Sequence, residues 1–257
     1  MAGIVRCLGV VLTAMIVGIA SAQAVPITGG SALLTDAHAS QLETWLGQGP
    51  ISLTNIFTKT TGQNTVDWHQ AVDGEGPTIT VMEVLPGTYQ VHDDQGQHAV
   101  TTTESILIGG YNPQSWSSAG DYTITLPDSM RTAFLFNLSD TIKQDQNLSS
   151  EGDAASGSYQ VYNTASYGPT FGGGHDLVVD SLLLGGYTKN YSFGGTSFAA
   201  DIMNLGGFYT EQIRIGGLET FTIAAYQPPA AVPEPSTLVL IGAGFVALGV
   251  IRRRKAA

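Results

Sequence analysis

Residues 167–177 read Tyr167-Gly-Pro-Thr-Phe-Gly-Gly-Gly-His-Asp-Leu177, and the rest of the sequence is best interpreted around them. Three consecutive glycines permit backbone angles and close approaches that a Cβ atom would block, and Pro169 fixes one turn of the same loop. Residues 177–180 then have the pattern of a strand, so the loop delivers His175 onto a sheet. Because residues two apart share a strand face, His175 should lie on the face of Leu177. If that face is the core, the histidine is partly buried.

The glycine loop allows several functional interpretations. A phosphate cradle would need a lysine and a following helix, which are missing here. A direct catalytic pair of His175 and Asp176 is disfavoured, because neighbouring residues on a strand face opposite ways. A structural corner is favoured, with a recognition surface as the second interpretation. The residues selected for either role, together with one carboxylate discussed below, are Tyr167, Gly168, Pro169, Phe171, Gly172, Gly173, Gly174, His175, Asp176 and Glu219.

The first residues follow the pattern of a secretory signal peptide. Arg6 precedes a short apolar run, and Ala22-Gln-Ala24 has the small-x-small form of a cleavage site. The apolar run is too short to span a bilayer. We therefore expect residues 1–24 to be removed and the exported chain to begin near Val25.

The last residues form a second signal. Residues 225–236 are a proline-rich linker, and residues 237–251 are uncharged. As a helix, this apolar run would cover roughly 22 Å, somewhat less than the roughly 30 Å of a hydrocarbon core. The basic cluster that follows should stay on the cytoplasmic side of the membrane. Residues 237–257 are therefore predicted to be a short transmembrane helix with an arginine-rich cytoplasmic end.

This C-terminal end closely resembles the PEP-CTERM sorting signal. The residues that carry the resemblance are Pro233, Glu234, Pro235, Arg252, Arg253 and Arg254. The resemblance implies a precursor anchored in the inner membrane of a Gram-negative bacterium that makes exopolysaccharide. It also implies processing near the proline-glutamate-proline motif by an exosortase-type enzyme, followed by delivery to the cell surface or extracellular matrix.

The body between the two signals is strongly acidic. Of 10 basic and 21 acidic residues, five basic residues and Glu234 lie in the two ends, which leaves five against twenty and a net charge of −15. Nucleic-acid binding depends on lysine and arginine contacts to phosphates, so nucleic acid is excluded as a partner. The single cysteine, Cys7, lies in the signal peptide, which excludes disulfides and thiol chemistry in the body. We expect no cofactor.

The body from residue 25 to 224 is predicted to be an α+β domain. Periodicity and capping residues predict helices at 35–46 and 64–72, which glycines 47 and 74 would end. The remaining expected elements are a strand at 78–84, a hairpin with arms at 89–92 and 97–101, a buried strand at 131–138, strands at 105–110, 159–162, 211–215 and 218–223, and irregular segments at 140–158 and 181–207. Residues 51–59 could be strand or helix.

Seven short motifs in the body occur in the order of the TLDc domain. They are Asp67-Trp-His69, Asp73-Gly-Glu-Gly-Pro-Thr78, Gly109-Gly-Tyr111, Ser115-Trp-Ser-Ser118, Ala133-Phe-Leu-Phe136, Tyr167 through Leu177 and Leu218-Glu-Thr-Phe221. The resemblance implies a β-sandwich of two packed antiparallel sheets flanked by short helices. Eukaryotic members are associated with oxidative-stress protection and with the vacuolar proton pump, and no established catalytic centre accompanies the fold. Export separates this chain from any cytosolic partner of the family.

Glu219 is expected to be a core-facing carboxylate, because it alternates with Phe221 and Ile223. A buried carboxylate needs backbone donors or a cationic or protonated partner. His175 and Arg131 are the plausible side-chain partners, so we expect Glu219 to be hydrogen-bonded to the glycine loop. A structural role is favoured over catalysis.

Three further sets of side chains are considered. His92, Asp94 and His98 could converge on a divalent metal across the hairpin, although we expect no metal there. His69 should cap or pack the second helix rather than act as a base. An aromatic group could either stack on sugars or simply cover a sheet edge; its members are Tyr187, Tyr191, Phe193, Phe208 and Tyr209.

Two hypotheses of function follow. The first is an exported, non-enzymatic binding or structural protein of the cell surface or extracellular matrix, with an exopolysaccharide or a surface protein as partner and no catalytic residue. The alternative is a surface hydrolase, or an antioxidant or metal-dependent enzyme, that uses His175 and Glu219.

Overall fold

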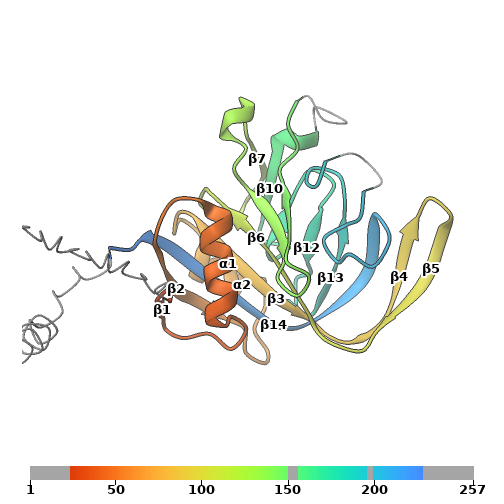
Figure 1. Ribbon diagram of the computed structural model, residues 1–257, viewed down its shortest axis with the longest axis horizontal. Coiled ribbons are helices and arrows are strands. Elements are labelled where there is room, and N and C mark those ends of the chain that lie inside the picture. The colour runs from red at the N-terminus through yellow and green to blue at the C-terminus, as the bar shows by residue number, and fades with distance from the viewer. Residues whose placement is uncertain (1–23, 150–155, 196–198, 228–257) are drawn as a thin grey trace, which may run out of the picture.

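Strand β14 (Tyr209–Ala225) is the longest strand and joins the two halves of the fold (Figure 1). The structure is a computed structural model, and it describes residues 24–149, 156–195 and 199–227. The register of β14 shifts between Ile215 and Leu218, where the strand passes from one half to the other. The two strands expected at 211–215 and 218–223 are therefore one strand with an irregularity between them.

The C-terminal part of β14 lies in the first half of the fold. It pairs with β2 (Ile51–Thr58) and β3 (Thr78–Val84), and the strands continue from β3 through β6 (Ile106–Asn112) and β8 (Phe134–Asn137) to β9 (Ile142–Asp145). The short β1 (Ile27–Thr28) runs parallel to β2.

The N-terminal part of β14 lies in the second half. It pairs with β4 (Gly87–Asp93) of the β4–β5 hairpin and with β13 (Gly185–Lys189), from which the strands continue through β12 (Leu177–Val179), β11 (Thr170–Phe171) and β10 (Tyr159–Thr164) to β7 (Ala119–Ile124). The second arm of the hairpin is β5 (Gly96–Thr102), as the sequence predicts.

Hydrogen bonds connect the described strands into one 14-stranded sheet, antiparallel in every pair except β1 with β2. The described residues are thus mostly antiparallel β-structure with two α-helices, which agrees with the β-rich class that the resemblance implies. Because β14 belongs to both halves, the arrangement as two separate packed sheets stays a prediction.

The two helices begin where the sequence predicts. Thr35 caps α1 (Asp36–Leu46), and Gly47 ends it in the left-handed conformation. Asn64 caps α2 (Thr65–Val72), and its backbone N–H donates in return to the carboxylate of Asp67. The second helix ends at Asp73, in extended backbone, rather than at the glycine that follows. Two short 3₁₀ turns are also present, η1 (Asp128–Met130) and η2 (Ser156–Ser158).

The central strands of the first half are buried on both faces. In β3, Ile79 and Val81 belong to a core that includes residues of α1, whereas Met82 and Val84 face a second core. The same alternation holds in β8, so the expectation of a central strand covered on two sides is confirmed. The second core also contains Phe171 of the glycine loop, so the loop lies on the opposite side of this sheet from α1.

Strands also form in segments whose local sequence pattern does not predict a strand. Residues 51–58 form β2, and β9 and β13 lie in segments expected to be irregular. Their pairing with distant strands supplies the backbone hydrogen bonds that their own sequences do not predict.

Candidate functional site

The glycine triplet brings the loop close to three side chains, as the sequence predicts. Gly172 has φ of +83°, and a Cβ there would overlap the carboxylate of Asp176. A Cβ on Gly173 would lie 2.8 Å from the ring of Tyr159, and one on Gly174 would lie 2.8 Å from Cβ of Tyr191. Each of these glycines therefore has a different neighbour that excludes a side chain.

The remaining predicted loop residues hold this corner in place. The N–H of Gly168 donates to the carbonyl of Val179 at 2.9 Å, and Val179 donates back to the carbonyl of Pro169 at 3.2 Å. Phe171 is fully buried and meets Trp116 edge to face, with ring centroids 5.3 Å apart. Tyr167, by contrast, is 38% exposed. The loop therefore has a buried, structural side and an exposed, aromatic side.

Asp176 anchors the buried side. Its side chain is fully buried, and Oδ1 accepts hydrogen bonds from the backbone N–H groups of Tyr191, Ser192 and Phe193 at 2.9, 2.6 and 2.9 Å. Burial raises the pKa of this carboxyl to about 7, and the three backbone donors only partly oppose that rise. Asp176 thus fixes residues 191–193 against the glycine loop.

His175 is half-buried, but on the face opposite to the one expected. Its backbone has φ of +55°, and β12 begins only at Leu177, so strand alternation does not extend back to the histidine. Leu177 and Val179 point into the core, whereas His175 lines a small hollow with Val178, Tyr167 and Tyr187. The prediction that His175 shares the face of Leu177 is wrong, because the left-handed residue turns the side chain over.

Tyrosines surround the imidazole of His175. Tyr162 stacks on it with ring centroids 5.3 Å apart, and Tyr187 lies nearly parallel at 6.5 Å. Tyr167 meets it edge to face at 5.8 Å, and Tyr122 lies at 6.4 Å. Burial lowers the pKa of His175, and the nearby Lys189 adds to this effect. The neutral imidazole is therefore the favoured form.

The hydrogen bonds define one tautomer of His175. The hydroxyl of Tyr122 lies 3.2 Å from the carbonyl of Gly173 and 3.3 Å from Nε2, and the hydroxyl of Tyr187 lies 3.3 Å from Nδ1. Because the carbonyl only accepts, Tyr122 donates its single proton there and accepts from Nε2–H. Nδ1 then accepts from Tyr187. Both ring nitrogens of the neutral histidine are satisfied by this arrangement.

The cluster continues in both directions as a row of rings. From one end to the other, the row consists of Tyr159, Tyr122, Tyr162, His175, Tyr187, Tyr209 and His92, with successive ring centroids 5.0, 4.6, 5.3, 6.5, 5.5 and 4.9 Å apart. All seven residues are partly exposed. We call this set, together with Tyr167, the aromatic row.

Strand register explains why the rings meet. Tyr162 of β10 is directly opposite Tyr122 of β7, and Tyr209 of β14 is directly opposite His92 of β4. Directly opposed residues share a face and bring their side chains together. The row therefore crosses the strands of the second half, of which Figure 1 labels β7, β10, β12, β13, β14 and β4.

Sequence reasoning found only part of this row. Of the aromatic group that it selected, Tyr187 and Tyr209 belong to the row, whereas Phe193 is fully buried in the core. Tyr191 lies under Gly174, with the ammonium of Lys189 5.3 Å above its ring. Aromatic residues at partly exposed positions of successive strands were the available signal, but the pairing of those strands was needed to use it.

Glu219 is buried, as expected, but its partner is different. Its carboxylate accepts hydrogen bonds from the hydroxyl of Ser31 and from the N–H of Ala32 at 2.8 Å and of Leu33 at 3.4 Å. Glu219 alternates with Phe221, which packs in the core shared with α1, whereas the glycine loop packs in the other core. The expected bond to the loop is therefore wrong, because the sheet lies between the two.

Arg131, the other side chain predicted to pair with Glu219, also bonds different residues. It donates to the carbonyls of Thr125 at 3.3 Å and Asn147 at 2.7 Å, and it forms an ion pair with Asp128 at 3.1 Å. Arg131 therefore fixes the turn around η1 and does not meet Glu219.

The proposed metal ligands of the hairpin do not converge. His98 is opposite Val91, one residue before His92, so the two imidazoles point to opposite faces of the hairpin. His92 bonds Glu211 at 2.8 Å, and His98 lies 3.5 Å from Asp93. In the described part of the chain, no three histidine, cysteine or acidic side chains are grouped to hold a metal ion. The weak metal candidates, with Asp94, are therefore not supported.

His69 is a packing residue, as expected. Its Nδ1 lies 2.8 Å from Asp73, and its Nε2 lies 2.8 and 3.1 Å from the carbonyls of Thr164 and Tyr167. The other carboxylate oxygen of Asp73 accepts from Ser118 at 2.7 Å. The serine thus meets the carboxylate rather than the imidazole, which is not the order of a catalytic triad. His69 holds α2 against the start of the glycine loop.

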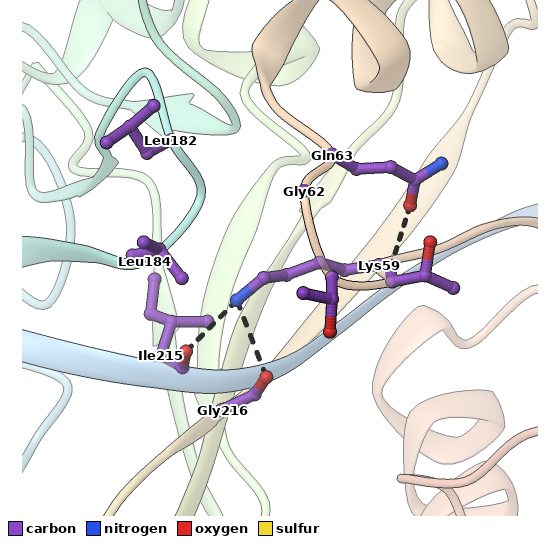
Figure 2. A pocket seen from close by; sticks show the side chains of 9 residues that line it. Lys59, Gly62, Gln63, Leu182, Leu184, Ile215 and Gly216 are labelled. Atoms are coloured by element: carbon purple, nitrogen blue, oxygen red, sulfur yellow. Dashed lines mark hydrogen bonds between the residues drawn. The ribbon is translucent and has the colours of Figure 1, made fainter.

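A cavity of about 590 Å³ lies beside the bend of β14 (Figure 2). Lys59 extends along it and donates from Nζ to the carbonyls of Ile215 at 3.1 Å and Gly216 at 3.5 Å. Burial lowers the pKa of Lys59, and the charge of Asp180 partly opposes this. The apolar side chains of Leu182 and Leu184 form another wall. The ammonium group thus stabilises the bend of the strand.

The predicted signals at the two ends lie outside the described residues, apart from Ala24 and residues 225–227 of the linker. Within the described residues, no helix is both long and apolar enough to cross a membrane. The predicted sorting motif, transmembrane helix and arginine cluster therefore lie outside the residues that this structure describes.

Comparison with protein families accounts for both parts of the chain. The model of the TLDc domain matches residues 27–224, and the model of the PEP-CTERM protein-sorting motif matches residues 231–255. No curated protein matches the chain. The sorting motif is that of exported proteins processed by exosortase-type enzymes, in agreement with the resemblance of the C-terminal residues. With the domain model covering most of the sequence, the chain belongs to the TLDc domain family.

Proposed function

We propose that this chain is an exported, non-enzymatic binding protein that attaches to an extracellular partner through the aromatic row. The single observation that carries the proposal is the continuity of the row. Seven partly exposed rings from five strands and one loop follow one another in space, each in contact with the next. Partly exposed aromatic side chains gathered on one face are characteristic of interaction sites.

The geometry around His175 supports binding over catalysis. Both of its ring nitrogens are engaged by tyrosine hydroxyls, and its tautomer is fixed by that network. The alternative enzyme needs His175 and Glu219 together, and the sheet separates these residues. A histidine held in this way serves to orient the rings next to it.

The sorting motif supplies the location in this proposal. The precursor is held in the inner membrane by residues 237–257, and an exosortase-type enzyme processes it near Pro233-Glu-Pro235. The acidic body of residues 25–224 then reaches the cell surface or the extracellular matrix. In that environment the aromatic row provides the attachment that the tail no longer provides.

Fractionation of cells that carry the matching exosortase tests both parts of the proposal. A Glu234→Ala change in the sorting motif should leave unprocessed precursor in the inner membrane. A combined Tyr162→Ala and Tyr187→Ala change should allow processing but release the protein into the medium. Tyr226→Ala, at a partly exposed tyrosine outside the row, is the matched control and should remain on the surface. Retention of the doubly changed protein at the level of the control would contradict the role of the row.

A further inference from the structure

The aromatic row has a direction that limits what it can bind. It runs across the strands, from Tyr159 on β10 to His92 on β4, and each ring contacts the next. A single small molecule would cover only one or two of these rings. A surface made of repeated, similar contacts in a line fits a ligand that is itself linear and repetitive.

We propose that the aromatic row binds an extended, uncharged polysaccharide that lies along the rings and across the strands. This inference rests on the proposed function and names the partner of the same site. Neighbouring rings of the row cover part of each other's faces, so a sugar unit would place its apolar C–H groups on the ring edges and on the parts of the faces that stay exposed, and the tyrosine hydroxyls can meet sugar hydroxyls. The repeating sugar units of a polymer would then use successive rings of the row.

The row is already ordered for such contacts. Tyr122 and Tyr187 are held by their hydrogen bonds to His175, and Tyr162 is held by stacking on the same imidazole. Ring side chains fixed before binding lose little conformational entropy when the ligand arrives. His175 is thus a positioning residue at the centre of the row.

Charge favours a neutral polymer over a polyanion. Burial raises the pKa of Tyr122, Tyr187 and Tyr209 above the ordinary tyrosine value, so these rings stay uncharged at neutral pH.

Three carboxylates lie beside the row: Asp121 precedes Tyr122, Asp180 lines the hollow of His175, and Glu211 bonds His92. Two positive charges oppose them: Lys189, which acts on His175, and Lys59, which interacts with Asp180. The acids still outnumber these two, and the body as a whole carries a net charge of −15 from five basic and twenty acidic residues. A polyanion would be repelled over this face.

Affinity electrophoresis of the full chain, purified in mild detergent, tests the inference. Hydroxyethylcellulose in the gel, as the uncharged probe, should slow the protein, and added salt should change this little because no ion pairs are involved. Tyr187→Ala and Tyr209→Ala should each weaken binding by about tenfold, the size expected for one lost stacking contact. Tyr226→Ala should bind like the unchanged protein. Cellohexaose should compete, and glucose should not.

Several outcomes would overturn this inference. They are the absence of retardation by hydroxyethylcellulose, retardation only by alginate as a polyanion or chitosan as a polycation, and unchanged binding by both row variants. Near-ultraviolet circular dichroism of each variant, compared with Tyr226→Ala, separates lost binding from lost folding. If polysaccharide binding fails while the row variants still leave the cell surface, the binding function stands and its partner is not an uncharged glycan. If surface retention is also unaffected, the proposed function itself fails.

Discussion

Gly172 lies against the carboxylate of Asp176 so closely that a Cβ atom on the glycine would overlap Oδ2. The same glycine has φ of +83°, a left-handed conformation that disfavours other residues. This contact connects the two roles of the glycine loop. Asp176 holds the segment 191–193, and the preceding residue, His175, presents its ring to the aromatic row.

We predict that Gly172→Ala strongly destabilises the protein. The left-handed backbone alone costs roughly 1–2 kcal/mol for a residue with a Cβ, and the overlap with a fully buried carboxylate adds to that cost. Gly74→Ala is the matched control, because Gly74 has φ of +82° and no atom within 4 Å of its ideal Cβ position. Urea unfolding should show a clearly larger loss for Gly172→Ala. Equal losses would mean that the Asp176 contact does not matter.

Asp176 predicts a dependence of stability on pH. Its pKa is raised to about 7 in the folded protein, whereas an unfolded aspartate titrates at about 3.9. Between these values the folded state holds a proton that the unfolded state has lost, so the free energy of unfolding falls as pH rises. The slope for this one group is at most about 1.4 kcal/mol per pH unit. Asp201, whose pKa is raised by burial to about 6, contributes in the same direction over part of the same range.

Asp176→Asn isolates this contribution. The amide can still accept the three backbone hydrogen bonds, but it does not titrate. The difference in free energy of unfolding, variant minus unchanged protein, should be more favourable to the variant at about pH 8 than at about pH 5. At the higher pH the unchanged protein must bury a charged carboxylate, which is the costly form, whereas the variant buries a neutral amide. Urea unfolding at the two pH values measures this difference. Asp201 and His175 are unchanged, so their effects cancel in the comparison. A stability difference that does not depend on pH would show that Asp176 titrates normally.

The local elements of this fold could be predicted because their signals are local. Thr35 and Asn64 cap their helices, and β3 has the predicted bounds of 78–84. The glycine triplet was also correctly interpreted as a point of close approach. In each case the deciding residues lie within a few positions of one another, and the backbone has few other choices there.

What escaped prediction depends on contacts between distant segments. Glu219 was correctly expected to be buried, but its donors are residues 31–33, on the far side of a sheet whose order the sequence does not reveal. The face of His175 was missed for a local reason instead: the residue itself has a left-handed backbone, which the strand pattern does not reveal. The aromatic row required the register of strands far apart in the sequence, such as Tyr209 opposite His92.

We predict that Glu219 attaches residues 31–33 to β14. A carboxylate that accepts from one hydroxyl and two N–H groups forms hydrogen bonds worth more than neutral ones. Glu219→Ala should therefore lower the free energy of unfolding by roughly 1–3 kcal/mol, since it removes the buried acceptor of three donors that are only partly exposed to water as a group. Hydrogen exchange at Ala32 and Leu33 should accelerate more than exchange in β8. Glu104→Ala, at an exposed acidic residue, is the control and should leave both measurements unchanged.

Lys59 should stabilise the bend of β14 without contributing to surface attachment. Its backbone N–H donates to the carbonyl of Leu218 at 2.8 Å, and its ammonium donates to the carbonyl of Ile215, on the other side of the register shift, and to that of Gly216, within it. Lys59→Met keeps the length and most of the apolar contacts of the side chain but removes the charged donor. It should lower the midpoint of urea unfolding while leaving the near-ultraviolet spectrum and the cell-surface retention of the folded protein unchanged.

Lys189→Met is the matched control for loss of one positive charge, because the ammonium of Lys189 lies over Tyr191 rather than at the bend. If Lys59→Met unfolds like Lys189→Met, the bend does not depend on the ammonium. If it also releases folded protein from the cell surface, the cavity beside Lys59 takes part in binding.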